Sequence, residues 1–424
     1  MLDRIKSFAN TEDKKRLLSN FMSLSILQGA NYLLPLITFP YLVRVLGVVY
    51  FGLLAFASAT IAYFNIITDY GFNIAATRKI SIQRTHKEKV SEIFSSVITI
   101  KLVLMLLSFL LLSLLVFSFD KFSKHWEIYF FTFGSVLGQM LFPVWFFQGM
   151  ERMKYITYLN IFSRLVFTIA IFIFVRKQSD YFMVPILNSL GMLLAGYWSF
   201  KIVKRNFGIS FSWQKKETLL YYLKDANQVF TTNVAISFYT TSTTFILGFF
   251  TSDTIVGYYA GAEKIIQAFK GLMTPVFQTI YPYISKQFSI SKENWSIFLK
   301  KMVLYTGVIT GFLSLLIFTF SKPLVDIILG NQYHNSIIIM QLLSFTVFMI
   351  GLSTTYVVLG FYAAAQQKIV MRFTVVISIF HIMIALIMIP LFQEIGASIT
   401  VLFTETMITL VCFIQFNSPM RFRG

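Results

Sequence analysis

Charged residues are scarce in this chain, and acidic residues are the scarcer kind. Only 13% of its 424 residues are charged, with 18 Asp and Glu against 36 Lys and Arg, whereas hydrophobic residues make up 56%. A water-soluble fold of this size could not hide so much apolar surface. The shortage of charge therefore excludes an ordinary soluble domain.

Cysteine and the common catalytic motifs are also nearly absent. The single cysteine, Cys412, lies in an apolar stretch and can make no intramolecular disulfide. No Gly-Lys dipeptide occurs, which removes a phosphate-cradling P-loop, and the four histidines are scattered over four segments without a metalloprotease pair. No Cys/His cluster suggests a metal. We therefore expect no enzyme, no ATP hydrolysis and no resident cofactor.

What the chain does contain is a series of charge-poor apolar stretches, each about 20 residues long, the length that crosses a bilayer as a helix. Residues 102–119 carry no charge and nothing more polar than three serines. The predicted spans lie near residues 21–43, 49–70, 95–119, 127–148, 156–175, 182–200, 227–250, 255–284, 302–320, 336–362, 369–390 and 396–416. The fold class is therefore an all-α polytopic membrane protein with about twelve transmembrane helices.

Lys and Arg alternate along the links between these spans. With a cytoplasmic N-terminus, the inner links and ends hold 26 of them and the outer links hold 6. Basic residues accumulate on the cytoplasmic side of membrane proteins, so we predict a multi-pass chain with both termini inside. The net charge of +18 is then explained by topology and by contact of the inner links with the lipid bilayer, in preference to nucleic-acid binding.

A short pattern recurs half a chain apart. Leu-Gly at 46–47 is followed by Gly-x-x-Ala-x-Ala from Gly52, and Leu-Gly at 247–248 by the same pattern from Gly257. A shared need for close helix packing could produce this pattern without a repeat. Read as a repeat, it relates two parallel six-helix lobes around a central cavity. We predict an N-lobe over residues 1–205, a cytoplasmic linker over 206–225 and a C-lobe over 226–424.

Prolines and a glycine fall within two of the predicted spans, at matching places in the two halves. Helix bends there would serve as the hinges of alternating access, although such residues also occur in spans with no moving role. They are Pro35, Pro40 and Gly47 in the first span and Pro275 and Pro282 in the eighth.

Ionisable residues inside predicted spans are functional candidates, because each is costly in lipid unless it is paired or hydrated. The basic ones are Arg44, Lys101, Arg164, Lys264 and Lys270, and the acidic ones are Asp69, Glu263 and Glu405. This cationic excess favours an anionic substrate such as a phosphate. We predict substrate contacts from Arg44, Arg164, Lys264 and Lys270, and a possible coupling site for H⁺ or Na⁺ at Asp69 and Glu263.

Each candidate also has a structural interpretation. Arg44 lies near the outer end of its span and could simply reach the interface, as could Lys101. Asp69 could cap its helix or pair with Arg78, and Glu263 with Lys264 could pair with neighbouring helices. The charge pattern alone leaves these alternatives open.

Four blocks of sequence carry a resemblance to a known family. Residues 39–57 (FPYLVRVLGVVYFGLLAFA) and 69–79 (DYGFNIAATRK) resemble the N-terminal blocks of bacterial polysaccharide-export flippases. Residues 143–164 (PVWFFQGMERMKYITYLNIFSR) and 256–269 (VGYYAGAEKIIQAF) resemble two later blocks, in the right order and spacing. The chain is similar throughout to O-antigen (Wzx-type) flippases of the multidrug/oligosaccharidyl-lipid/polysaccharide exporter superfamily.

The resemblance implies two six-helix lobes and transport of undecaprenyl-pyrophosphate-linked oligosaccharide across the bacterial inner membrane, next to the polysaccharide polymerase and ligase machinery. The alternative is a multidrug or cation antiporter of the same superfamily, which would be expected to bind organic cations in an acidic, aromatic cavity. A glycan polymerase or ligase would be expected to carry a large periplasmic loop, which the predicted spans do not leave room for. The sugars themselves, and the choice between O-antigen and capsule, cannot be read from the residues.

Overall fold

The structure, a computed structural model, describes residues 12–417, and every regular element in that range is helical. This confirms the predicted all-α polytopic class. Within that range, eight helical stretches are long and apolar enough to cross a membrane. Two of them, Ile26–Gln83 and Gln367–Phe416, contain 58 and 50 residues and are each interrupted by a break, so each supplies two passes of about 20 residues. The broken helix pairs over 216–250 and 253–290 complete the twelve predicted passes.

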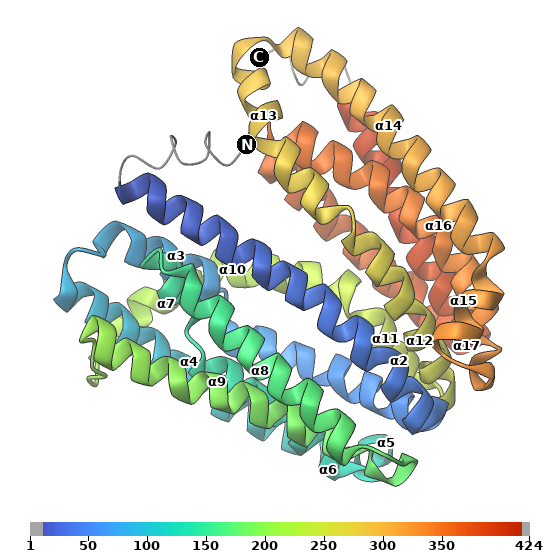
Figure 1. The fold of residues 1–424 in the computed structure, drawn as a ribbon, viewed down its shortest axis with the longest axis horizontal. Helices are drawn as coiled ribbons and strands as arrows, with labels where there is room; N and C mark the ends of the chain where they lie inside the picture. Colours follow the sequence, from blue (N-terminus) through green and yellow to red (C-terminus); the bar gives the residue numbers. More distant parts are fainter. Residues whose placement is uncertain (1–11, 418–424) are drawn as a thin grey trace. The chain divides into compact units, whose positions relative to one another are not determined.

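The elements follow one another along the chain with short connections (Figure 1). They are α2 (Glu12–Asp69), α3 (Phe72–Gln83), α4 (Lys87–Ser118), α5 (Asp120–Ser123), α6 (Trp126–Leu141), α7 (Val144–Gly149), α8 (Met153–Phe174), α9 (Met183–Phe207), α10 (Lys216–Thr240), α11 (Ser242–Phe250), α12 (Asp253–Gly271), α13 (Thr274–Ile290), α14 (Lys292–Thr319), α15 (Ser321–Ile328), α16 (Ser336–Thr354) and α17 (Gln367–Asn417). Short 3₁₀ turns occupy Gln178–Asp180 and Asn331–Tyr333, and a π-helical segment, Thr355–Tyr362, follows α16.

The chain divides into two compact units. Unit 1 contains the chain up to Leu46 together with Ala57–Val234, and unit 2 contains Gly47–Phe56 together with the chain from Ala235 onward. Residues 216–225, part of the predicted linker, form the first turns of α10, which passes from one unit to the other after Val234. The predicted lobe boundaries at residues 205 and 226 stay a prediction.

In unit 1, α4, α6, α8 and α9 run alongside one another, with α3 and α7 together at one end (Figure 1). Glycines let α6 and α9 approach closely: a Cβ on Gly138 would lie 2.5 Å from Met192, and one on Gly196 would lie 2.7 Å from Leu141. Small residues at such contacts are what holds helices together where the solvent is itself apolar. The core is aromatic and includes the fully buried Trp145 on α7.

In unit 2, α16 packs against α14, α17 and α12. Trp295, buried near the start of α14, donates its indole N–H to the carbonyl of Leu359 at 3.0 Å. That carbonyl lies in the π-helical segment, where regular helical hydrogen bonding is altered. The Trp295 ring also contacts Phe416 at the end of α17, so this one side chain connects α14 to both the irregular segment and α17.

The predicted helix bends lie at some of the expected residues. α2 continues through Pro35 and Pro40 and breaks at Gly47, whose φ of 71° is a left-handed conformation that favours glycine. The eighth predicted span is two helices, because α12 ends at Gly271 and α13 begins at Thr274, directly before Pro275. In a continuous helix Pro275 would have no N–H to donate to the Gly271 carbonyl and its ring would clash with that carbonyl, which accounts for the break.

The repeated glycines of the two half-chains meet inside unit 2. A Cβ on Gly52 would lie 1.8 Å from the Asp253 carbonyl oxygen and 2.6 Å from the Gly257 nitrogen. A Cβ on Gly257 would lie 2.1 Å from the carbonyl oxygen of Val48. The two backbones therefore touch directly, and the pattern seen in the sequence serves a contact between its own two copies.

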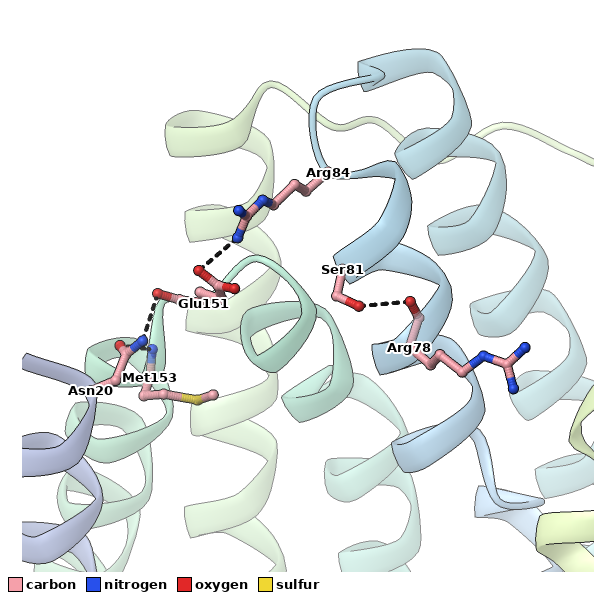
Figure 2. Close-up of polar contacts among 6 residues, drawn as sticks. All are labelled: Asn20, Arg78, Ser81, Arg84, Glu151 and Met153. Atoms are coloured by element: carbon pink, nitrogen blue, oxygen red, sulfur yellow. Dashed lines mark hydrogen bonds and ion pairs between the residues drawn. The ribbon is translucent and has the colours of Figure 1, made fainter. Parts of the chain in front are cut away.

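A network of polar contacts, here called the polar lock, connects α2, the end of α3 and the α7–α8 turn in unit 1 (Figure 2). Arg84, just after α3, pairs with the Glu151 carboxylate at 2.6 Å. Asn20 on α2 donates to the Glu151 carbonyl at 3.1 Å and accepts from the Met153 backbone N–H at 3.2 Å. Arg78 points away from this lock in Figure 2. The family-like block at 143–164 therefore includes residues that fix the α7–α8 turn to α2 and α3.

Candidate functional site

Unit 2 contains a cavity of about 730 Å³ between α12, α13, α16 and the π-helical segment. Its lining residues are Lys270, Gly271, Met273, Thr274, Phe277, Gln278, Tyr281, Val347, Ile350, Gly351, Thr354, Val358 and Tyr362. Of these, Lys270 is the one with a charged side chain. The cavity combines an aromatic and aliphatic wall with a few hydroxyl and amide groups, the composition of a site for a large amphiphilic ligand.

Lys270 owes its position to the end of α12. It stands in the last turn of that helix, where a cation interacts favourably with the exposed carbonyl groups. The break after Gly271 leaves its side chain at the cavity wall instead of against a continuing helix. Lys270 interacts electrostatically with Glu405 of α17 and with Glu263 two turns earlier on α12. Two predicted site residues, Lys270 and Glu263, are thus brought into one cluster.

Glu263 is held by neutral hydrogen-bond donors. Its carboxylate accepts from the Thr244 hydroxyl at 3.4 Å and from the Gln267 amide at 3.1 Å. Lys264, beside it in sequence, is an exposed side chain. Glu263 therefore contacts α11 through Thr244 and the next turn of α12 through Gln267.

His381 continues this polar interior of unit 2. Its ring is 1% exposed, with Nε2 at 3.1 Å from the Thr243 hydroxyl and Nδ1 at 2.8 Å from the Thr404 hydroxyl. Because α17 breaks at Gln393, these contacts connect α11 to the parts of α17 before and after the break. Glu405, which follows Thr404, is one of the ionisable residues inside the predicted spans but is not among the predicted site residues. The pairs Thr400/Thr404, four residues apart, and Thr406/Thr409, three residues apart, are the signal that could have drawn attention to it.

In unit 1, Arg164 lies half-buried on α8, and its Nε has no hydrogen-bond partner in the protein. The same is true of the Asn31 side-chain oxygen on α2. The two helices run side by side in register, since Thr157 donates to the Ser23 carbonyl at 2.9 Å and Tyr41 to the Val175 carbonyl at 2.7 Å. Equal rise along both helices sets Asn31 level with Arg164.

An unpartnered donor and an unpartnered acceptor thus occur at one level of unit 1. Leaving such a buried group unpaired costs about 1–3 kcal/mol. A polar ligand that both accepts and donates, such as a sugar hydroxyl next to a phosphate, would satisfy both groups.

Asp69 is the last residue of α2, and Arg44 lies in the same helix shortly before its break at Gly47. The Asp69 carboxylate lies 3.0 Å from Nζ of Lys101 on α4, and the Lys101 side chain is only 4% exposed. Asp69 therefore pairs with Lys101 and not with Arg78, the alternative drawn from the sequence, and Lys101 is not an interfacial anchor. Arg44 is exposed, three residues before the Gly47 break.

The predicted site residues thus separate by unit. Arg44, Asp69 and Arg164 lie in unit 1, and Glu263, Lys264 and Lys270 lie in unit 2. Within the described range, no group of three or more His, Cys, Asp and Glu side chains could hold a metal ion.

Two helical units with membrane-length passes, and buried charge beside a cavity, define a polytopic membrane transporter. Solved structures share this fold. The lipid II flippase MurJ in an inward closed conformation superimposes with a TM-score of 0.71 at 13% identity, covering 96% of this chain and 88% of that one. An inward-facing MATE-family multidrug transporter gives a TM-score of 0.66 at 13% identity, with 92% and 94% coverage.

The sequence comparisons are more specific than the fold. Residues 17–288 match the model of the family described as polysaccharide biosynthesis protein. A protein of Escherichia coli (strain K12), provisionally named an O-antigen transporter, is 34% identical over 96% of this chain and 98% of its own length. One of Shigella dysenteriae with the same name is 27% identical over 92% and 98%. The chain belongs to the polysaccharide biosynthesis protein family.

Proposed function

We propose that this protein is a flippase that moves an undecaprenyl-pyrophosphate-linked oligosaccharide, an O-antigen or capsule repeat unit, from the cytoplasmic to the periplasmic face of the inner membrane by alternating access. The observation that carries this proposal is the 34% identity over 96% of the chain to a protein provisionally named an O-antigen transporter. The MurJ fold, seen in a protein named as a lipid II flippase, agrees with it.

Because the proposed substrate is anionic, the basic residues are the groups expected to bind it. A pyrophosphate carries about two negative charges, and its outward passage gains roughly 4–5 kcal/mol at 100 mV, inside negative. We propose Arg44, Arg164, Lys264 and Lys270 as its contacts. Support is strongest for Lys270, which lines the cavity of unit 2, and for Arg164, whose Nε lacks a partner.

Ion coupling is a second part of the proposal, with H⁺ or Na⁺ as the candidate ion. Glu263 and Asp69 are its candidate groups. Glu263 is supported by its contact with neutral donors and by the nearby Lys270 and Glu405, a cluster that could exchange a proton or cation when its surroundings change. Asp69 is the weaker candidate, because the buried Lys101 already occupies it. The membrane potential acting on the pyrophosphate is the simpler alternative.

The rest of the proposal follows from the pathway that this substrate implies. We place the chain in the inner membrane with both termini in the cytoplasm, on the basis of its 26-to-6 distribution of basic residues. It acts without catalysis of its own, and passes its substrate to polysaccharide polymerase and ligase machinery. The runner-up, a multidrug or cation antiporter, rests on the shared fold of the MATE transporters alone.

Complementation of flippase-deficient bacteria with defined repeat units tests the class and the substrate together. We expect restored surface polysaccharide, seen as a lipopolysaccharide ladder, with at least one repeat unit and no change in drug susceptibility. Increased resistance to organic cations without any restored ladder, at normal protein level, would favour the antiporter instead.

A further inference from the structure

Two adjoining hollows lie at the C-terminal end of α9, in unit 1. One, of about 850 Å³, is lined by Trp198, Lys201, Ile202, Lys204, Arg205 and Asn206. The other, of about 420 Å³, is lined by Phe94, Tyr197, Phe200, Lys201, Val203, Lys204, Ile209, Ser210 and Phe211. Both are lined by Lys201 and Lys204, so a basic hollow and a mostly apolar one adjoin at these two lysines.

The apolar hollow is built by a reversal of the chain after α9. Gly208 ends that helix in the left-handed conformation, with φ of 62°. The chain then lies against α4, where the Ser91 hydroxyl donates to the Ser210 carbonyl at 3.0 Å and the Ser212 backbone N–H donates to the Ser95 hydroxyl at 3.1 Å. These bonds hold the wall formed by Ile209 and Phe211 in place.

The basic hollow contains three cations and no carboxylate among its lining residues. In the described part of the chain, no ion pair joins Lys201, Lys204 or Arg205 to an acidic group. Lys204 and Arg205 lie in the last turn of α9. Cations are favourable there because they interact with the exposed carbonyl groups at the end of the helix. That interaction does not explain Lys201, whose Nζ lies 4.6 Å and 5.1 Å from the ring centres of Tyr197 and Trp198.

The surface of α9 beside the hollows is apolar and exposed. Leu190, Leu194 and Tyr197 are 49%, 39% and 54% exposed and repeat at helical spacing towards Lys201. Tyr and Trp gather at the membrane–water boundary, with Lys and Arg just outside it on the cytoplasmic side. Along this helix face, apolar side chains suited to acyl chains come first, then aromatic rings, and then three basic side chains.

We propose that these hollows form a binding site for an anionic glycerophospholipid of the cytoplasmic leaflet, with the phosphate among Lys201, Lys204 and Arg205 and one acyl chain along Phe94 and Phe211. Basic pockets on the cytoplasmic side of membrane proteins bind anionic lipid head groups, and the predicted topology places the C-terminal end of α9 on that side. The lipid is a resident of the bilayer and not the transported substrate, because the site opens on the exposed face of α9. The proposal is independent of which saccharide is carried.

The test measures lipid binding to the purified full-length protein by native mass spectrometry and by thermal unfolding, with dioleoyl phosphatidylglycerol or dioleoyl phosphatidylethanolamine added. The site variant is Lys201→Ala/Lys204→Ala/Arg205→Ala. The matched control is Lys215→Ala/Lys216→Ala/Lys224→Ala, which removes the same charge from exposed positions outside both hollows. We expect phosphatidylglycerol to bind and stabilise the unmodified protein and the control, and the site variant to bind it roughly a hundredfold more weakly.

A second variant, Phe211→Ser, tests the apolar half without changing charge. We expect it to weaken phosphatidylglycerol binding while leaving any response to inorganic pyrophosphate unchanged. Equal loss in the control triple variant would mean a diffuse surface charge effect and overturns the site. Protection by inorganic pyrophosphate alone, or by undecaprenyl pyrophosphate but not phosphatidylglycerol, also overturns it.

Discussion

Three cationic side chains of this protein meet three different surroundings. Lys101 is buried against Asp69, Lys270 lines a cavity with Glu405 and Glu263 in electrostatic range, and Arg164 keeps an Nε without a partner. A neutralised cation supports the fold, whereas a cation with donors to spare is suited to a ligand. Position in the sequence did not separate these cases, because it does not say which helix each side chain meets.

Replacing Lys270 is expected to abolish transport by removing the charged member of the cavity wall. Lys270→Met should leave no lipopolysaccharide ladder in a flippase-deficient strain, whereas Lys300→Ala, an exposed lysine of α14, should leave a normal ladder. Because Lys270→Met also leaves Glu405 without its cation, Lys270→Met/Glu405→Gln serves as a second variant. A normal ladder from that double variant, at normal membrane level, would show that Lys270 acts only by pairing with Glu405.

Arg164 and Asn31 are expected to act as a pair of ligand-binding groups. Arg164→Lys keeps the charge but loses the forked donors, so transport rate should fall by about tenfold or more. Asn31→Leu should have a similar effect, because it removes the matching acceptor. Transport of lipid-linked saccharide in vesicles measures both, with immunoblots as the control for protein level. Unchanged rates in both variants would mean that water satisfies the two groups and that no ligand binds there.

At the scale of elements, helix ends and breaks position the charges. α12 ends one residue after Lys270, α2 ends at Asp69, and the break at Gly47 follows Arg44 by three residues. Three of the candidate groups, Lys270, Asp69 and Arg44, therefore lie at or near a helix end or break, whereas Arg164, Glu263 and Lys264 lie within their helices.

The Asp69–Lys101 pair is expected to stabilise the protein by connecting α2 and α4, which is why Asp69 is the weaker of the two candidates for ion coupling. Asp69→Asn leaves Lys101 buried and unpaired, which should destabilise the protein by about 3–5 kcal/mol. Asp69→Leu/Lys101→Met should recover most of that loss, as measured by thermal unfolding in detergent. If the double variant is stable but no longer responds to an imposed pH or Na⁺ gradient in vesicles, Asp69 is a coupling group after all.

The glycine contact in unit 2 is expected to reject any side chain. Gly52→Ala and Gly257→Ala each place a Cβ about 2 Å from a backbone carbonyl oxygen, and overpacking of this kind costs about 1–3 kcal/mol or more. Both variants should lower the melting temperature and the level in the membrane. Gly29→Ala is the matched control, because a Cβ there meets nothing within 4 Å. Similar melting temperatures for all three variants would contradict the close approach.

The sequence predicted helices well and their partners poorly. Apolar runs of membrane length located the passes, and Gly47 and Pro275 marked two real breaks. The pairing of Asp69 with Lys101 and the bridge from His381 to Thr243 and Thr404 were missed, because periodicity defines a face of a helix but not its neighbour. Residues 216–225 have no apolar run, so the sequence predicted a linker where α10 begins. These first turns of α10 instead make polar contacts, such as the ion pair of Asp225 with Lys79 at 3.4 Å.

At the scale of the whole molecule, the predicted topology of twelve passes with alternating direction can be measured directly. Reporter fusions after Lys89, Lys216 and Lys292 should report a cytoplasmic location, and fusions after Lys124, Lys177 and Gln332 a periplasmic one. The physical reason is the concentration of 26 basic residues on one side against 6 on the other. A periplasmic reporter after Lys216 would rule out this topology.

Residues Gly47–Phe56 belong to unit 2 although the chain on both sides of them belongs to unit 1, so the two units cannot be separated by a single cut in the chain. If the gene were cut in the connection between α9 and α10, the first polypeptide would still contain the ten-residue piece that packs on Asp253 and Gly257 of the second. The two products would then be held together by an exchanged segment as well as by the membrane. Co-expressed halves should therefore co-purify, and Gly52→Ala in the first half should separate them.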